Sequence, residues 1–315
     1  MISKTTGMDW LKKHIKELEV TTTQFKEITK EIIKISPAVC NSFQAWTPLK
    51  LVLLNYLIDV CSLIIDRNIK NKKVFEESYY VDLFAGSGLN KIGQDYLIGS
   101  PLISLLKYSN RFNTLFFCEK EKILFDALQK RLNFAKKDNF VLVNNDCNKY
   151  LDDVITKISK PKSYSFFFID PHGMEFSWNS MIKILRVRSD IVFTFMTSEI
   201  YRAIGLSKSG KSNGNCLTDF FGDESWKEVK DYEELVHKYE SNISKVRLNS
   251  LIEDIKIKST KFNFCYHIIF VTNKTKNECP WMRAIGKAKR EIESNSDKSV
   301  EMALEIIKKR QDTLF

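Results

Sequence analysis

The chain has 315 residues, of which 43% are hydrophobic, 28% charged and 12% aromatic, and glycine and proline together number only 17 (11 and 6). These figures exclude collagen-like, low-complexity and largely disordered proteins, and a chain of this length can bury one large core. The formal charge of +10 favours a polyanionic partner such as nucleic acid, although the Lys-, Ile- and Asn-rich composition expected of an AT-rich genome would produce the same surplus.

The sequence gives no sign of a membrane segment or a secretory leader. No run reaches the ~18 consecutive apolar residues that a bilayer requires, and the polar N-terminus has no small-residue cleavage site. The seven cysteines are widely spaced without a Cys-x-x-Cys pair, which favours reduced thiols and predicts no metal site. We therefore expect a cytoplasmic protein.

The first part of the chain is helical. Two patterns of apolar residues at helical spacing cover 10–18 and 25–33, and Pro48 then opens a long apolar helix. Because the apolar residues of this third helix surround more than one face, we expect it to be buried against a sheet. We predict a helical appendage at 1–45 and an α/β domain at 46–315.

The pattern then changes to short apolar runs that alternate with helical segments. This alternation is typical of a parallel sheet covered by helices on both faces. It predicts a doubly wound, Rossmann-like α/β fold whose sheet is mostly parallel and ends in a late antiparallel strand at 261–273. The five predicted parallel strands are 79–84, 115–119, 140–146, 164–170 and 190–196. The first helix after a strand begins at Ser100, taken as its N-cap, and the later predicted helices cover 122–135, 148–158, 178–187, 280–293 and 297–309.

A helical insertion is predicted at 198–255. It begins near a Ser/Gly/Lys/Asn loop at 207–215, and 198–262 contain 11 basic and 11 acidic residues, so this region carries none of the positive surplus. Gly205 to Ser212 match the P-loop pattern G-x-x-x-x-G-K-[ST]. A P-loop needs an apolar strand directly before it and an unbroken helix after it, and this segment has neither, so we reject nucleotide hydrolysis.

The first predicted strand runs into the most informative motif of the chain, Asp82-Leu-Phe84-Ala-Gly86-Ser-Gly88. Two glycines at this spacing let the backbone turn sharply and approach a nucleotide-like ligand at the carboxyl end of the sheet. No third glycine follows at the spacing of a dinucleotide site, and an acid before the glycines suits a cationic or amine-bearing ligand better than a phosphate.

This motif resembles the first motif of class I S-adenosylmethionine-dependent methyltransferases. The resemblance implies that Asp82, Phe84, Gly86 and Gly88 contribute to S-adenosylmethionine binding. It also assigns the acids at the ends of the next two strands, Glu119 to the ribose hydroxyls and Asp146 to the surroundings of the adenine. Each acid taken alone is equally explained as a solvated strand end or a helix cap.

The fourth predicted strand ends in Asp170-Pro171-His172-Gly173. Amino-group methyltransferases carry an Asp/Asn-Pro-Pro-aromatic motif at this place, whose oxygens accept hydrogen bonds from the target amine and whose aromatic ring stacks on the base. We therefore take Asp170, Pro171 and His172 as candidate catalytic residues. The Asp-Pro-x-Gly variant resembles that of enzymes that methylate the guanine N2 amine in transfer RNA, whereas His172 in a turn is equally explained as a structural hydrogen-bonding residue.

The order of all these motifs resembles the three-Cys-motif partner protein (TcmP) family over roughly residues 45–290. The resemblance implies a methyltransferase-like fold, a partnership with a separate three-cysteine protein and a role in antiviral defence. We take Trp178, Lys208 and Lys211 as candidate substrate-binding residues, the lysines for a DNA or RNA backbone. The first hypothesis is methyl transfer to an exocyclic amine of a nucleic-acid base. The alternative is a catalytically degenerate methyltransferase-fold subunit that acts by forming a complex.

Overall fold

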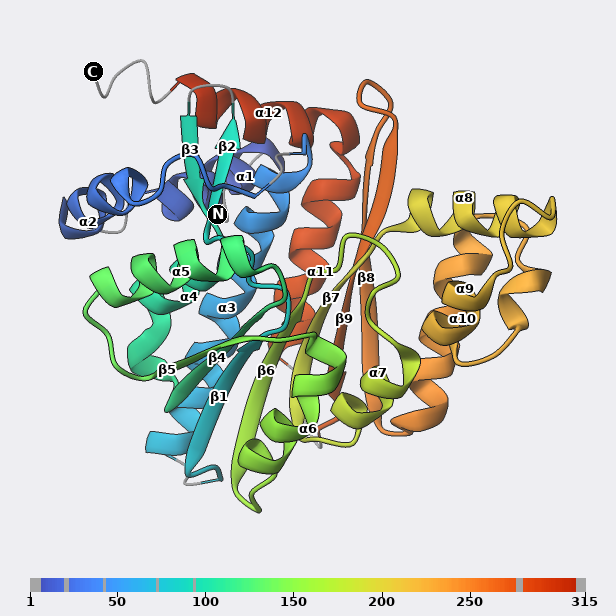
Figure 1. The fold of residues 1–315 in the computed structure, drawn as a ribbon, viewed down its shortest axis with the longest axis horizontal. Coiled ribbons are helices and arrows are strands. Elements are labelled where there is room, and N and C mark those ends of the chain that lie inside the picture. Colours follow the sequence, from blue (N-terminus) through green and yellow to red (C-terminus); the bar gives the residue numbers. More distant parts are fainter. Residues whose placement is uncertain are drawn as a thin grey trace, which may run out of the picture.

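The computed structural model describes residues 7–19, 23–41, 44–71, 74–92, 95–275 and 280–309. Residues 1–6 and 20 lie outside the described residues. They belong to the N-terminal stretch from which we predicted the absence of a leader. The centre of the molecule is a seven-stranded sheet with helices on both faces (Figure 1). Its strands are β1 (Glu77–Asp82), β4 (Thr114–Glu119), β5 (Phe140–Asn144), β6 (Ser163–Ile169), β7 (Ser189–Phe195), β8 (Ser250–Ser259) and β9 (Phe264–Asn273).

The strand order confirms the doubly wound prediction. In space the order is β5-β4-β1-β6-β7-β9-β8, in which β9 runs antiparallel to β7 and β8 while the pairs among β1, β4, β5, β6 and β7 are parallel. The chain first builds outward from β1 through β4 to β5, and then continues from the other side of β1 with β6 and β7. Ligands of open α/β sheets bind outside the carboxyl ends of the strands at such a switch point, which lies here between β1 and β6.

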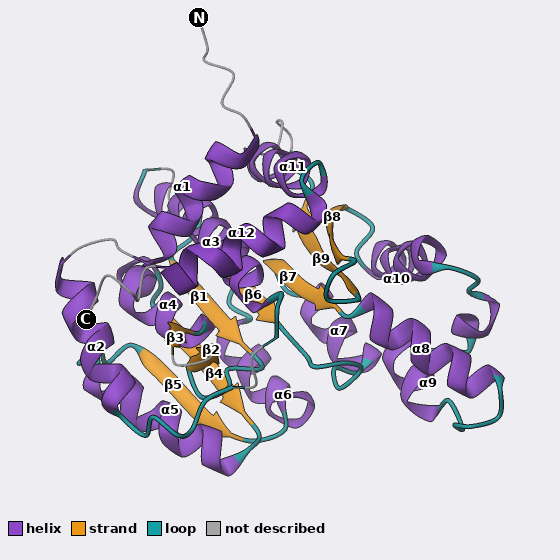
Figure 2. Cartoon of the chain, turned by 90° about the horizontal axis from the view of Figure 1, so that it is seen from above, coloured by secondary structure: helices purple, strands orange, loops and turns teal. Residues whose placement is uncertain are grey.

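Helices cover both faces of the sheet (Figure 2). Alternate residues of each central strand face opposite sides: Tyr80 and Phe166 belong to one hydrophobic core, Tyr79 and Phe167 to the other. The first core is completed by α1 (Gly7–Glu19), α3 (Thr47–Lys70), α4 (Ser100–Tyr108), α5 (Lys122–Phe134), α11 (Pro280–Glu293) and α12 (Ser296–Lys309), with α2 (Thr23–Lys34) packed at its margin. The second core is completed by α6 (Cys147–Ile158), α7 (Trp178–Leu185), α8 (Thr197–Lys208), α9 (Asn215–Phe221) and α10 (Tyr232–Val246).

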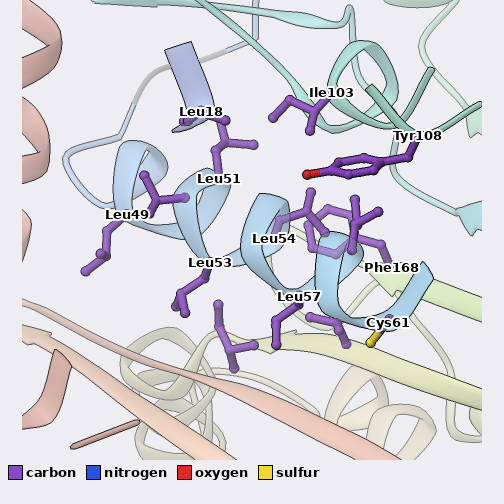
Figure 3. Close-up of a cluster of buried hydrophobic side chains, with 14 of the residues drawn as sticks. Leu18, Leu49, Leu51, Leu53, Leu54, Leu57, Cys61, Ile103, Tyr108 and Phe168 are labelled. Atoms are coloured by element: carbon purple, nitrogen blue, oxygen red, sulfur yellow. The ribbon is translucent and has the colours of Figure 1, made fainter. Parts of the chain in front are cut away.

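Helix α3 is the main core helix, as its apolar sequence predicts. By length and composition it could cross a membrane, but 67% of its most apolar 18-residue window is buried inside the fold. Leu49, Leu53 and Leu57 are among the side chains that it buries, and Figure 3 shows them among residues contributed by α1, α4 and β6. The apolar surface of α3 is therefore used for packing within the protein.

Two local predictions differ from the structure, and one element was not predicted. Residues 250–255, predicted as the end of the helical insertion, form the first part of β8, and the helices of the insertion end at Val246. The segment between the glycine loop and α4 forms an antiparallel hairpin of β2 (Leu89–Ile92) and β3 (Asp95–Ile98). Ser100, predicted as the N-cap of α4, is its first helical residue, and Gly99 is the N-cap.

Two further short elements complete the described chain, the 3-10 turns η1 (Ser109–Arg111) and η2 (Ser225–Glu228). The P-loop pattern is not a P-loop in the structure. Gly205 lies inside helix α8, no strand runs into it, and the next helix begins only at Asn215. The rejection of that motif is confirmed.

Candidate functional site

A cavity of about 640 Å³ opens at the carboxyl ends of the central strands, at the switch point of the sheet. Its size lies in the range of small-molecule sites. The structure brings seven of the predicted site residues to its wall: Phe84, Gly86, Glu119, Asp146, Asp170, Pro171 and His172.

The glycine loop after β1 forms one side of the cavity. Gly86 has φ +62°, a conformation that favours glycine, and a Cβ on it would lie only 2.5 Å from Oδ1 of Asn41. Two backbone N–H groups of this loop are held by side chains: Gly86 N donates to Glu119 Oε2 at 2.7 Å, and Ser87 N donates to Asn41 Oδ1 at 2.7 Å. The loop is therefore fixed in shape from two directions.

Glu119, at the end of β4, is held in place by backbone groups. One oxygen accepts from Gly86 N and the other from Glu121 N, also at 2.7 Å. Burial raises the pKa of Glu119, and the two N–H groups oppose that effect. An ionised carboxylate has about four lone-pair positions, so this one can accept further hydrogen bonds from a ligand in the cavity.

Asp146 is both a helix cap and a residue of the cavity wall, the two positions that its place after a strand allowed. Its Oδ1 caps α6 by accepting from Asn148 N at 2.9 Å, and its Oδ2 lies 3.5 Å from Nζ of Lys120. It also lines the cavity. An N-cap bond of this kind stabilises the helix and at the same time fixes the direction of the carboxylate.

Asp170 follows β6 and forms an ion pair that the sequence did not predict. Its Oδ2 accepts from Nζ of Lys50 on α3 at 2.5 Å, across 120 residues of sequence. The side chains are only 18% and 13% exposed, so water screens the pair little. Asp170 is thus held by a cation from the N-terminal part of the chain.

Two residues of the glycine motif do not reach the cavity wall. Asp82 is fully buried beneath the loop, where its Oδ1 accepts from Phe84 N at 3.2 Å, and burial raises its pKa to about 7. Gly88 faces the core, where a Cβ would approach Leu128 to 2.9 Å. Both residues shape the loop from below and do not line the cavity.

The three predicted substrate-binding residues also lie elsewhere. Trp178 packs edge-on against Tyr239 at 5.4 Å, and its Cδ1 lies 2.0 Å from the position that a Cβ of Gly222 would take. Nζ of Lys208 donates to the carbonyl of Val229 at 2.7 Å. Helix α8 starts near the cavity and is about 18 Å long, and Lys208 is its last residue. Lys211 lies in the turn that follows the helix.

The wall contains residues that the sequence did not single out: Asn41, Gln44, Trp46 and Lys50. All four precede β1. No local motif identifies them, and three of the four contact segments more than 45 residues away in the sequence: Asn41 contacts Ser87, Trp46 contacts Phe264 and Lys50 contacts Asp170. The N-terminal part of the chain is therefore a structural part of the site.

The balance of charge in the cavity is negative. Glu119, Glu121, Asp146, Asp170, Glu175 and Glu199 line it, against the cations of Lys50 and Lys120. Such a site favours a ligand with positive charge. Among the described residues, no group of three or more His, Cys, Asp or Glu side chains is placed to hold a metal ion.

Comparisons with known proteins find similar structures but no similar sequence. No protein-family model matches the chain. No curated protein matches it either. An O-methyltransferase from Bacillus cereus, solved with S-adenosylhomocysteine, has a TM-score of 0.45 and 10% identity over 87% of this chain and 100% of its own. Trm1 from Pyrococcus horikoshii, solved with S-adenosyl-L-methionine, has a TM-score of 0.41 and 11% identity over 84% and 76%.

Proposed function

We propose that this chain is an S-adenosylmethionine-dependent methyltransferase. The observation that carries the proposal is the cavity itself, which combines a glycine turn, two fixed strand-end carboxylates and a separate carboxylate at Asp170 around one switch point. The cofactor carries a positive sulfonium and an ammonium, and the acidic wall suits that charge. Gly86 and Phe84 would lie along it, and Glu119 would accept hydrogen bonds from its ribose.

When bound, the cofactor supplies an electrophilic methyl group. Asp170 and the main chain of Pro171 would accept hydrogen bonds from an amine on the acceptor and orient its lone pair. As positive charge develops on the amine nitrogen, the carboxylate of Asp170 stabilises it. The half-buried position of this carboxylate keeps bulk water away and strengthens that effect.

We infer that the acceptor is an exocyclic amine of a base in DNA or RNA. Support comes from the Asp170-Pro171-x-Gly173 loop at the cavity and from the positive charge of the chain. A TcmP-type partnership with a three-cysteine protein and a role in antiviral defence belong to the same proposal and rest on motif order alone. A cytoplasmic location is also proposed, from the wide spacing of the cysteines.

The proposal is tested by calorimetric titration and labelled-methyl transfer. We expect S-adenosylmethionine and S-adenosylhomocysteine to bind, and Glu119→Ala to weaken binding by about tenfold or more, because it removes a carboxylate that holds both loop and ligand. Asp170→Ala should retain cofactor binding and lose transfer to nucleic acid. Normal cofactor binding with no methyl transfer to any DNA or RNA would contradict the acceptor assignment.

A second function is favoured by the Lys50–Asp170 ion pair, because the cation occupies an oxygen that an amine would use. In that case the fold is a binding subunit of a complex. Co-purification of a stoichiometric partner, together with full biological function of Asp170→Ala, would support this alternative. Turnover by the isolated chain would exclude it.

A further inference from the structure

The first turn of α3 forms a wall of the cavity that no sequence motif marks. Trp46 is the N-cap of this helix, and its carbonyl accepts from Lys50 N at 3.1 Å. Residues four apart lie on the same face of a helix, and both side chains line the cavity. The turn therefore presents an aromatic ring and a cation side by side next to Asp170.

Lys50 determines how Asp170 is presented. It holds Oδ2, while Oδ1 has no hydrogen-bond partner among the described residues. One oxygen of the carboxylate is thus fixed by a neighbour and the other is left to accept a donor. A pre-oriented acceptor of this kind needs no rearrangement when a substrate amine arrives.

Trp46 is held in a defined orientation and is not fully covered. Its ring packs on Phe264 at 4.8 Å and on Tyr266 at 6.2 Å, both from β9, yet the residue remains half-buried and lines the cavity. The Asp170–Gly173 loop itself contributes no large aromatic ring. Trp46 is the large ring on the α3 side of the cavity within the described part of the chain.

We propose that Trp46 and Lys50 form the acceptor subsite of the methyl transfer proposed above, on which this inference rests. Trp46 stacks on the planar ring that carries the amine, and Lys50 is a positioning residue for Asp170. Because the Asp170 side chain is only 18% exposed, the base must enter the cavity. A base inside a duplex cannot do so, and the substrate is therefore an unpaired or flipped-out base.

The test uses single-stranded DNA and RNA oligonucleotides that contain 2-aminopurine, a base with an exocyclic amine whose fluorescence is quenched by stacking. Each is titrated into protein saturated with S-adenosylhomocysteine. We expect quenching with the wild type and with Trp46→Phe, and binding at least about fivefold weaker with Trp46→Ala, since stacking on one aromatic ring contributes this much or more. Whether the DNA or the RNA oligonucleotide binds identifies the type of nucleic acid that the protein accepts.

The affinity for S-adenosylhomocysteine is measured for every variant and should be unchanged, which shows that the cofactor side is intact. Wild-type affinity of Trp46→Ala for the oligonucleotide overturns the stacking role. Failure of the wild type to bind either oligonucleotide, while it binds S-adenosylhomocysteine, overturns the acceptor class. Failure to bind S-adenosylhomocysteine contradicts the cofactor assignment itself and removes the basis of the subsite.

Lys50 is tested by methyl transfer to the oligonucleotide that binds. We expect Lys50→Met to lower kcat by about tenfold or more with little change in KM, because the base still stacks but Asp170 is no longer held. Lys50→Arg should restore much of kcat, since it also supplies a cation to the carboxylate. An unchanged kcat in Lys50→Met, or a change confined to KM, overturns the positioning role.

Discussion

Among single residues, Asp82 carries the clearest electrostatic consequence. Its carboxyl is completely buried, and desolvation raises its pKa from 3.8 to about 7, with the charges of Asp170 and Glu119 acting in the same direction. Hydrogen bonds from Ser100 and from Phe84 N oppose the shift. Between pH 4 and 7 the native state therefore holds a proton that the unfolded chain has lost.

Because the native state binds this proton more tightly than the unfolded chain, the stability of the protein depends on pH. The contribution of Asp82 to stability is fully present below pH ~4 and is lost as pH rises through about 7. We expect the free energy of unfolding in urea to fall between pH 5.5 and 8, and Asp82→Asn to reduce that slope. Asp190, whose pKa burial raises to about 6, leaves part of the slope in place. Asp153→Asn, on the exposed face of α6, is the control and should keep the wild-type slope.

The site residues divide into those that the sequence could reveal and those that it could not. Glu119, Asp146 and Asp170 were predictable because parallel strands end at one edge of the sheet, and an acid at each end must lie there. Trp46 and Lys50 belong to a helix whose apolar pattern indicates burial only. Their position in the cavity depends on how α3 crosses the sheet, which no local pattern encodes.

At the scale of elements, Arg131 joins the N-terminal segment to the glycine loop. This α5 side chain is fully buried, and its guanidinium donates to the carbonyls of Ile35, Ser36 and Val39 and to that of Ser87. Asn41 completes the junction, because its own N–H donates to Leu89 O at 2.8 Å. The segment that ends at Asn41 is thus attached to the loop by buried polar contacts.

We expect Arg131→Met to lower the free energy of unfolding by about 2–3 kcal/mol, because it leaves several buried carbonyls without donors. Amide hydrogen exchange should increase at 35–41 and 86–89, and the affinity for S-adenosylhomocysteine should fall. Lys130→Met, an exposed neighbour on the same helix, is the matched control. Unchanged exchange at 86–89 in Arg131→Met would show that the loop keeps its shape without the guanidinium.

The elements differ in how well the sequence predicted them. The central strands are continuous apolar runs because both of their faces are covered, and the pattern predicted each of them. The apolar pattern does not predict the first part of β8, residues 250–255, which falls in the expected helical insertion, because Glu253 and Asp254 interrupt its apolar residues. It is an edge strand, and charged side chains are usual there.

At the scale of the whole molecule, helix α1 is packed into the main core. Leu11 and Ile15 are at most 1% exposed, in the same cluster as α3, α11 and α12. We expect Ile15→Ala to lower stability by about 2–5 kcal/mol and to shift a single cooperative transition. Ile123→Ala, 70% exposed on α5, should change stability little. A separate early transition in Ile15→Ala would instead support an N-terminal appendage that folds independently.

The support of Trp46 by β9 also bears on the order in which the protein matures during synthesis. The residues that line the cavity extend no further along the chain than Glu199, whereas the indole rests on Phe264 and Tyr266. At ribosomal rates the 65 residues between 199 and 264 take roughly 3–13 s to translate. The residues that line the cavity are therefore synthesised before the strand that supports the indole, and a product truncated before β9 would lack that support altogether.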